Sequence, residues 1–134
     1  MVETGVSAGR SSAFILAALE DNDKGELISI DPDPNSGYAI PKPLRSRWKF
    51  INGKSEEVLP SILDEIESID LFLHDSLHMY DHMLFEYRTV WPYIKNGGIL
   101  VSDDIDFNRA FSEFAKEVGR NPVFLSRSFA GIRK

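Results

Sequence analysis

The chain has 134 residues, of which 43% are hydrophobic and 27% are charged, an ordinary composition for a globular domain. This length predicts one domain over residues 1–134. A net charge of −6 argues against a general nucleic-acid binder, and the absence of cysteine excludes disulfides and thiolate metal sites. No apolar run approaches the roughly 20 residues of a membrane span and no signal peptide follows Met1, so we expect a cytoplasmic protein.

Strand and helix signals alternate along the chain. Strands are predicted at residues 1–4, 26–30, 48–52, 70–74, 99–102, 122–125 and 130–133. Helices are predicted at residues 11–22 and 55–66, over an apolar stripe from Met83 to Ile94 that Asn96-Gly97-Gly98 ends, and over a second stripe from Phe107 to Val118. Residues 32–47 hold four prolines, which argues against a regular helix there. The alternation predicts an α/β fold, a Rossmann-like, doubly wound and mostly parallel sheet of about seven strands with an antiparallel C-terminal strand.

The first candidate site follows the first two predicted strands. Gly5 and Gly9 border a loop that runs into a helix, where backbone N–H groups can approach a small ligand closely. Asp31 ends the second strand, in a position to accept hydrogen bonds from a ribose diol. Each element alone is equally well explained as a turn, but together they favour a nucleoside ligand. The fingerprint G-x-G-x-x-G is absent, which argues against a nicotinamide dinucleotide.

The second candidate site follows the fourth and fifth predicted strands. Five acidic and histidine residues fall within nine positions, and a pair of aspartates comes later: His74, Asp75, His78, Asp81 and His82, then Asp103 and Asp104. Neighbouring parallel strands lie about 4.8 Å apart, so Asp75 and the aspartate pair are expected to converge on one Mg²⁺, Mn²⁺ or Ca²⁺ ion. His78 suits a general base because its ordinary pKa is near neutral.

Simpler explanations exist for the same residues. Asp75 ends a strand, Asp103 can cap the helix that follows, and His78 is equally well explained as a half-buried residue at a helix start. A zinc pair of His78 and His82 is disfavoured, because Met79 stands where an H-E-x-x-H motif has glutamate.

Together these motifs resemble the class I S-adenosylmethionine-dependent methyltransferases, particularly a bacterial branch of small O-methyltransferase-like domains. Glu3, Gly5 and Gly9 match the E-x-G-x-x-x-G of that family's first strand, and Asp31 matches its ribose-binding acid. Residues 53–60 (G-K-S-E-E-V-L-P) resemble its G-x-S-x-x-x-L-P step near the adenine, although many members carry an acid where this chain has Lys54. Residues 91–101 (W-P-Y-I-K-N-G-G-I-L-V) resemble its W-x-x-L-x-x-G-G approach to the fifth strand.

The resemblance implies an S-adenosylmethionine-dependent methyltransferase acting on a small hydroxylated acceptor. It implies that six residues hold the cofactor: Glu3, Gly5, Ser7, Gly9, Asp31 and Ser55. Asp75 and His78 would be catalytic. Metal-dependent O-methyltransferases of the catechol and caffeoyl-CoA type use an aspartate after the fourth strand and a pair after the fifth, which implies a divalent metal at Asp75, Asp103 and Asp104. The alternatives are a catalytically inactive cofactor-binding scaffold and, with less support, a nicotinamide-dependent oxidoreductase.

Two further features bear on the acceptor and on assembly. Between Asp33 and Glu56 the chain holds no acid and five basic residues: Lys42, Arg45, Arg47, Lys49 and Lys54. This basic run is explained either as a solvated loop or as a surface that steers an anionic acceptor to the site. The chain begins on its first strand, without the leader helix usual in the family, and its second crossover is rich in proline. One face of the sheet is therefore expected to be poorly covered, which predicts a homodimer or a truncated domain.

Overall fold

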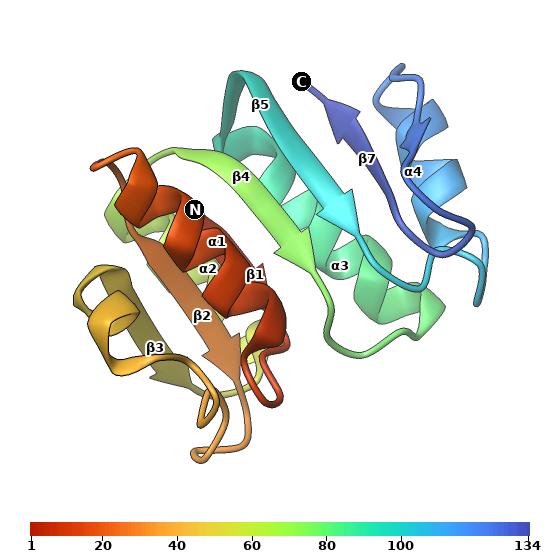
Figure 1. The fold of residues 1–134 in the computed structure, drawn as a ribbon. Coiled ribbons are helices and arrows are strands. Elements are labelled where there is room, and N and C mark those ends of the chain that lie inside the picture. Colours follow the sequence, from red (N-terminus) through yellow and green to blue (C-terminus); the bar gives the residue numbers. More distant parts are fainter.

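The computed structural model describes residues 1–134. Its strands form one seven-stranded sheet in the order β3-β2-β1-β4-β5-β7-β6 (Figure 1). Its strands are β1 (Val2–Thr4), β2 (Leu27–Asp31), β3 (Trp48–Asn52), β4 (Ile69–His74), β5 (Ile94–Ser102), β6 (Val123–Phe124) and β7 (Ala130–Arg133). The first five strands pair in parallel, whereas β7 runs antiparallel to both β5 and β6. The predicted fold class is confirmed, including the antiparallel C-terminal strand.

Helices cover the two faces of this sheet unequally. On one face lie α1 (Arg10–Asp21) and the 3₁₀ helix η1 (Lys42–Arg47), and on the other lie α2 (Ser55–Ile66), α3 (Tyr80–Val90) and α4 (Ala110–Glu117) (Figure 1). The face with three helices holds a core cluster of 20 buried residues, whereas the cluster around α1 has only four: Leu16, Leu19, Leu27 and Ile40. The hydrophobic stabilisation of the domain is therefore concentrated on one side of the sheet.

On the face with three helices, the buried residues of each helix follow its apolar periodicity. Helix α2 buries Leu59, Ile62 and Leu63 on one stripe, and α4 buries Phe111 and Phe114. Two acidic residues occupy the first turn of α2, where the positive end of the helix dipole favours them. None of the helices is both long enough and apolar enough to cross a membrane.

The junction between α3 and β5 differs from the expectation. The helix ends at Val90, a 3₁₀ turn η2 (Trp91–Tyr93) follows, and Ile94 already begins β5 by pairing with Ile69. The prediction of a helix to Ile94 is wrong because the glycines mark an irregular strand and not a helix end. The β4–β5 register shifts there, Gly97 has a φ of +85°, and a Cβ on Gly98 would lie 2.9 Å from the carbonyl oxygen of Asp70.

The start of α4 also differs from the expectation. Phe107 was expected on the helical stripe, but it precedes the helix and is 67% exposed. The side-chain oxygen of Asn108 accepts the N–H of Ala110 at 2.8 Å, so the helix begins after the asparagine. Phe107 instead packs edge-on against the ring of His78, with 5.6 Å between ring centroids.

The four central parallel strands β2, β1, β4 and β5 end at the same edge of the sheet (Figure 1). Ligands of open parallel sheets bind beyond this edge, so the loops after these strands are where chemistry is expected.

Candidate functional site

A cavity of about 500 Å³ opens beyond the ends of β1, β2 and β4. Four of the predicted cofactor-binding residues line it: Gly5, Ser7, Asp31 and Ser55. The glycine loop after β1 forms one wall, and the loop before α2, with Gly53 and Lys54, forms another. The structure therefore brings the two predicted halves of a nucleoside site to one cavity.

Close backbone packing requires glycine at the start of this loop. Gly5 has a φ of +81°, and a Cβ added to it would lie 1.9 Å from the carbonyl oxygen of Asp75. Any side chain here would push the end of β1 away from the end of β4. Ser7 also adopts a positive φ, of 49°, so the loop curls back on itself.

The carboxylate of Asp31 organises this loop. Its Oδ2 accepts the backbone N–H groups of Val6 at 2.8 Å and Ser7 at 3.1 Å, and its Oδ1 accepts that of Asp33 at 2.8 Å. Partial burial alone would raise the pKa of Asp31, but these backbone donors outweigh it and lower the pKa below its ordinary value. Asp31 is therefore a charged acceptor at the wall of the cavity.

Two of the predicted cofactor residues, Glu3 and Gly9, lie outside the cavity lining. Glu3 is fully buried in β1 and accepts hydrogen bonds from the hydroxyls of Ser12 in α1 and Ser29 in β2, and burial raises its pKa. A Cβ on Gly9 would lie 2.6 Å from Ile40, so this glycine lets α1 pack against the second crossover. Both residues support the glycine loop from outside the cavity lining.

Asp75 and Asp103 are held at one edge by the backbone. The N–H of Asp75 donates to the carbonyl of Thr4 and that of Asp103 to the carbonyl of His74, both at 2.9 Å, so the parallel ladders continue one residue past the strands. Burial and the nearby charge of Asp103 raise the pKa of Asp75 to about 6. The two side chains are thus close enough for their charges to repel each other.

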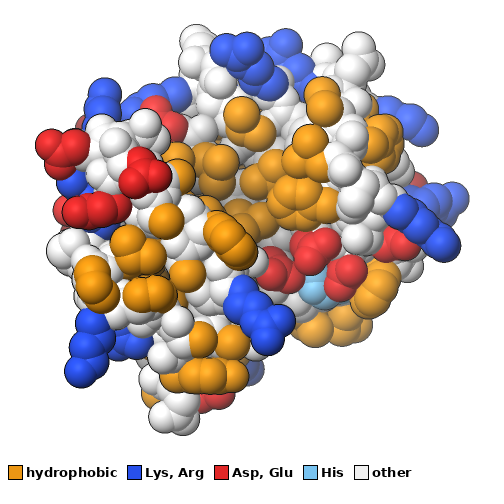
Figure 2. All heavy atoms as spheres, viewed as in Figure 1, with side chains coloured by type: hydrophobic (Ala, Val, Ile, Leu, Met, Phe, Trp, Pro, Cys, Tyr) orange, Lys and Arg blue, Asp and Glu red, His pale blue; other side chains and the backbone are white.

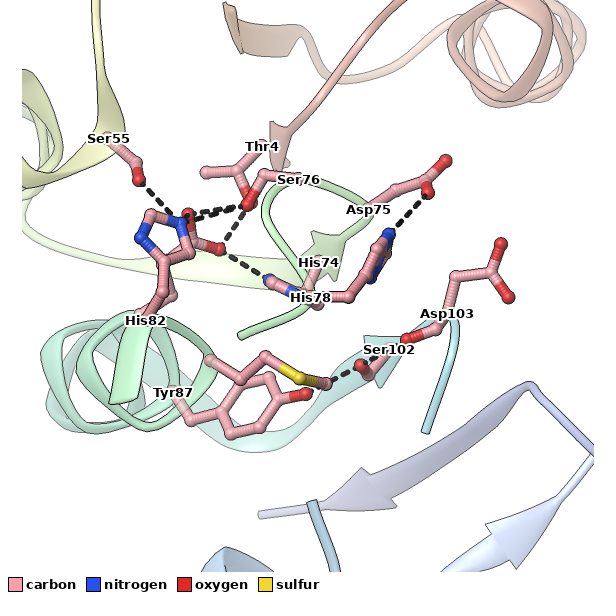
Figure 3. A network of polar contacts seen from close by, with 12 residues as sticks. Thr4, Ser55, His74, Asp75, Ser76, His78, His82, Tyr87, Ser102 and Asp103 are labelled. Carbon is pink, nitrogen blue, oxygen red and sulfur yellow. Dashed lines mark hydrogen bonds and ion pairs between the residues drawn. The ribbon is translucent and has the colours of Figure 1, made fainter. Parts of the chain in front are cut away.

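His78 bridges two of these acids. Its Nε2 lies 3.3 Å from Oδ2 of Asp104 and 3.8 Å from Oδ1 of Asp75, and its Nδ1 is buried without a partner. Figure 3 shows the ring directed toward Asp75. Burial and the neighbouring His74 lower the pKa of His78, while Asp104 opposes that shift. A neutral His78 is therefore favoured near pH 7, in contact with groups that would stabilise its protonated form.

The carboxylates fit a divalent cation in their chemistry, since they are hard oxygen donors, and the charges of Asp103 and Asp104 help to raise the pKa of Asp75. As the side chains stand, however, no three acidic or histidine groups converge on a single point. Asp75, Asp103 and Asp104 therefore lie at one edge of the sheet without forming a three-ligand metal site.

A second hollow, the apolar groove, meets the cavity at Asp75. It has a volume of about 330 Å³, and both Asp75 and Asp103 line its end. Its remaining lining comes from α1, the sheet face and the C-terminal segment: Ser11, Phe14, Ile15, Leu71, Leu73, Val101 and Phe129. Figure 2 shows this hydrophobic hollow ending at a group of acidic side chains. The groove lies on the thinly covered face of the sheet, as the sequence predicted.

A buried polar network lies behind the cavity. Glu86 of α3 is fully buried and accepts hydrogen bonds from Thr4 Oγ1 at 2.5 Å and Ser76 Oγ at 2.8 Å. It also contacts His74 Nδ1 at 2.7 Å and His82 Nε2 at 2.9 Å. Figure 3 labels these four partners. Burial alone would raise the pKa of Glu86, but the two histidines hold it well below its ordinary value. The network ties α3 to the ends of β1 and β4.

Sequence reasoning missed Glu86 altogether and treated His82 only as a disfavoured zinc ligand. The two histidines of that pair in fact serve different acids, since His78 faces Asp75 and Asp104 whereas His82 faces Glu56 and Glu86. One signal was available. Glu86 interrupts the apolar stripe of α3 four residues after His82, and a charged residue on a buried stripe requires a partner.

The basic run does not form a free cationic patch. Arg47 pairs with Glu20 and Asp23, and Arg45 lies over the ring of Trp48 while it donates to backbone carbonyls. Of the run, Lys54 alone lines the cavity. The arrangement therefore gives no support to steering of an anionic acceptor.

Residues 2–105 match the family described as "Methyltransferase domain". Among solved structures, the O-methyltransferase NovP superposes with a TM-score of 0.82 at 16% identity, over 100% of this chain and 71% of that one. Apo CalS11, a TDP-rhamnose 3'-O-methyltransferase of calicheamicin biosynthesis, gives 0.78 at 20% identity, over 99% and 70%. MycE from the mycinamycin pathway, in complex with Mg, SAH and mycinamycin VI, gives 0.74 at 16% identity, over 99% and 44%.

No curated protein matches the chain by sequence. At these levels of identity the solved structures show a shared fold, while the family match rests on the sequence and covers most of the chain. The chain therefore belongs to the class I S-adenosylmethionine-dependent methyltransferases.

Proposed function

We propose that this domain binds S-adenosylmethionine in the cavity and transfers the methyl group to a hydroxyl of a small acceptor. The observation that carries the proposal is the meeting of two hollows at Asp75. The cavity is lined by the glycine loop and Asp31, and the apolar groove ends at Asp75 and Asp103. A cofactor in the first and an acceptor at the mouth of the second would meet beside His78.

Each cavity residue has a distinct part in this proposal. Asp31 would accept a ribose hydroxyl through the lone pair of Oδ1 that its three backbone donors leave free. Gly5 and Ser7 would bring backbone close to the cofactor, and Ser55 would border the base. Glu3 and Gly9 would hold the loop in shape.

The reaction needs alignment and a base. As the acceptor oxygen forms a bond to the methyl carbon, the carbon–sulfur bond breaks and its electron pair stays on sulfur. Much of the catalysis can come from holding the reactants in line. Asp75, whose pKa is raised to about 6, would take the hydroxyl proton, and the Nε2–H of His78 would donate to Asp104 and hold the acidic edge in place.

A divalent metal is the less supported part of the proposal. Asp75, Asp103 and Asp104 would hold Mg²⁺, Mn²⁺ or Ca²⁺, and the ion would lower the pKa of a bound hydroxyl and orient it. Activity that disappears on EDTA treatment and returns with Mg²⁺ or Mn²⁺ would support the metal. Full activity after EDTA treatment would refute it.

The proposal as a whole is tested by binding and turnover. Calorimetry should show S-adenosylhomocysteine binding to the chain while NADH does not bind. Mass spectrometry should then find products heavier by one methylene among small hydroxylated compounds, and His78→Asn should slow turnover while it leaves cofactor affinity unchanged. Cofactor binding without transfer to any acceptor would identify the chain as a binding scaffold, and no cofactor binding would overturn the proposal.

A further inference from the structure

The apolar groove has an apolar body and an acidic end. Six hydrophobic residues line its body, whereas Asp75 and Asp103 line its end, and no lysine, arginine or histidine belongs to the lining. Arg10 precedes the lining residue Ser11 in α1, but Arg10 itself is outside the lining. Figure 2 shows the hydrophobic surface running up to the acidic side chains. The groove therefore suits a ligand that is apolar along most of its length and differs in charge at one end.

One oxygen of Asp103 is free to accept a hydrogen bond from such a ligand. Its Oδ1 accepts the backbone N–H of Asp104 at 2.9 Å, whereas its Oδ2 makes no hydrogen bond within the protein. His78 pairs with the neighbouring Asp75 and Asp104, and no ion pair reaches Asp103. A carboxylate oxygen can only accept hydrogen bonds, and its strongest partners are charged donors. Oδ2 of Asp103 is therefore complementary to a protonated amino group.

The lining also excludes ligands of the opposite charge. A carboxylate or phosphate at this end would face two acidic side chains and no basic one, beside apolar walls that strengthen the repulsion. A protonated amine at the same place would be attracted. Because Asp75 lies at the same end and faces the hydroxyl in the proposed reaction, the amine and the hydroxyl belong on neighbouring carbons of the ligand.

We propose that the acceptor is a vicinal amino alcohol with an apolar body, whose protonated amino group binds Asp103 while its hydroxyl faces Asp75. This inference rests on the proposed function, because the groove is the acceptor site of that reaction. Asp103 is then the residue that determines specificity for the charge of the acceptor.

The test uses three probes that share a phenyl ring and a benzylic hydroxyl and differ in the charge of the neighbouring group. At pH 7, 2-amino-1-phenylethanol is cationic, 1-phenylethane-1,2-diol is neutral and mandelate is anionic. Calorimetry measures the Kd of each probe on the chain with S-adenosylhomocysteine, in EDTA so that no divalent ion competes for the carboxylates. The cation should bind at least about tenfold more tightly than the diol, and mandelate should bind more weakly than the diol. Added salt should reduce these differences.

Three variants separate charge from apolar contact. Asp103→Asn keeps an acceptor for the N–H of Asp104 but removes the charge, so the ratio of the two Kd values for cation and diol should fall close to one. Asp106→Asn is the matched control and should keep the wild-type ratio, because Asp106 follows the same strand, is exposed and does not line the groove. Phe14→Ala should weaken all three probes by similar factors and leave the ratio unchanged, because Phe14 lines the apolar body.

Several results would overturn this inference and leave the proposed function standing. They are equal binding of the three probes, a preference for mandelate, and an Asp103→Asn variant that still prefers the cation. Binding of none of the probes would also overturn it, and twice the chain mass in light scattering would then assign the groove to a second chain. A chain that does not bind S-adenosylhomocysteine overturns the proposed function and this inference with it.

Discussion

Replacing Asp31 by alanine should abolish most of the affinity for S-adenosylhomocysteine. The carboxylate is 8% exposed and already accepts three backbone N–H groups at 2.8–3.1 Å, so it is rigidly placed at the cavity wall. A ribose hydroxyl would add one hydrogen bond to this charged group, contributing about 1.5–3 kcal/mol. Loss of this bond corresponds to a Kd about ten- to a hundredfold weaker, because 1.4 kcal/mol is a factor of ten.

The same substitution also disturbs the loop, so affinity and stability must be measured together. Leaving three backbone donors without an acceptor should lower the free energy of unfolding by about 1–3 kcal/mol, which urea denaturation would report. Asp31→Asn keeps a carbonyl oxygen and should fall between the wild type and the alanine variant. Asp33→Ala removes a carboxylate that caps only an exposed turn and should leave the Kd within about twofold.

One result would refute this reasoning. If Asp31→Ala binds S-adenosylhomocysteine within about threefold of the wild type while urea denaturation shows the expected loss of stability, Asp31 only shapes the loop. The cofactor would then have to be held elsewhere in the cavity.

Three further predictions follow from the geometry. Gly5→Ala should lower the free energy of unfolding in urea by at least about 2 kcal/mol, from left-handed strain and contact with the Asp75 carbonyl. Gly119→Ala, at a positive φ in open space, should cost only about 1 kcal/mol, and equal losses would contradict the packing argument. Because the pKa of His82 is raised in the folded state, its contribution to Tm is full below about pH 6.5 and is lost as the pH rises through the folded pKa. Because the pKa of Glu86 is lowered, its contribution to Tm is full above about pH 4.3 and is lost on acidification. His82→Asn should therefore flatten the Tm profile on the alkaline side, and an unchanged profile would contradict this. The apolar groove predicts a homodimer, to be seen as twice the chain mass in light scattering, and a clean monomer at all concentrations would refute it.

Much of the candidate site was predictable because chemistry in a parallel sheet lies where strands end. Gly5, Asp31 and Asp75 each directly follow or end a β-branched or apolar run, so their approach to one another follows from strand order alone. His78 and Asp104 were assigned to the same candidate site after the fourth and fifth strands, and Nε2 of His78 lies 3.3 Å from Oδ2 of Asp104.

What could not be predicted depends on contacts between distant segments. The hydrogen bonds of Glu86 reach Thr4, which is 82 residues away, and no local pattern contains that partner. The start of β5 was missed because the stripe through Trp91 and Ile94 satisfies helical periodicity, whereas pairing with Ile69 decides the outcome. Tertiary hydrogen bonding overrides local periodicity in both cases.

The contact between Gly5 and the Asp75 backbone has a consequence for how such a domain changes over evolution. With no side chain between them, the loop after β1 and the backbone at Asp75 form one rigid unit, and a change in either displaces the other. Phe14 and Phe129 line the apolar groove without such a backbone contact, and Phe14 is 80% exposed. New acceptor preferences should therefore arise by exchange of these outer residues, while the machinery next to them stays the same.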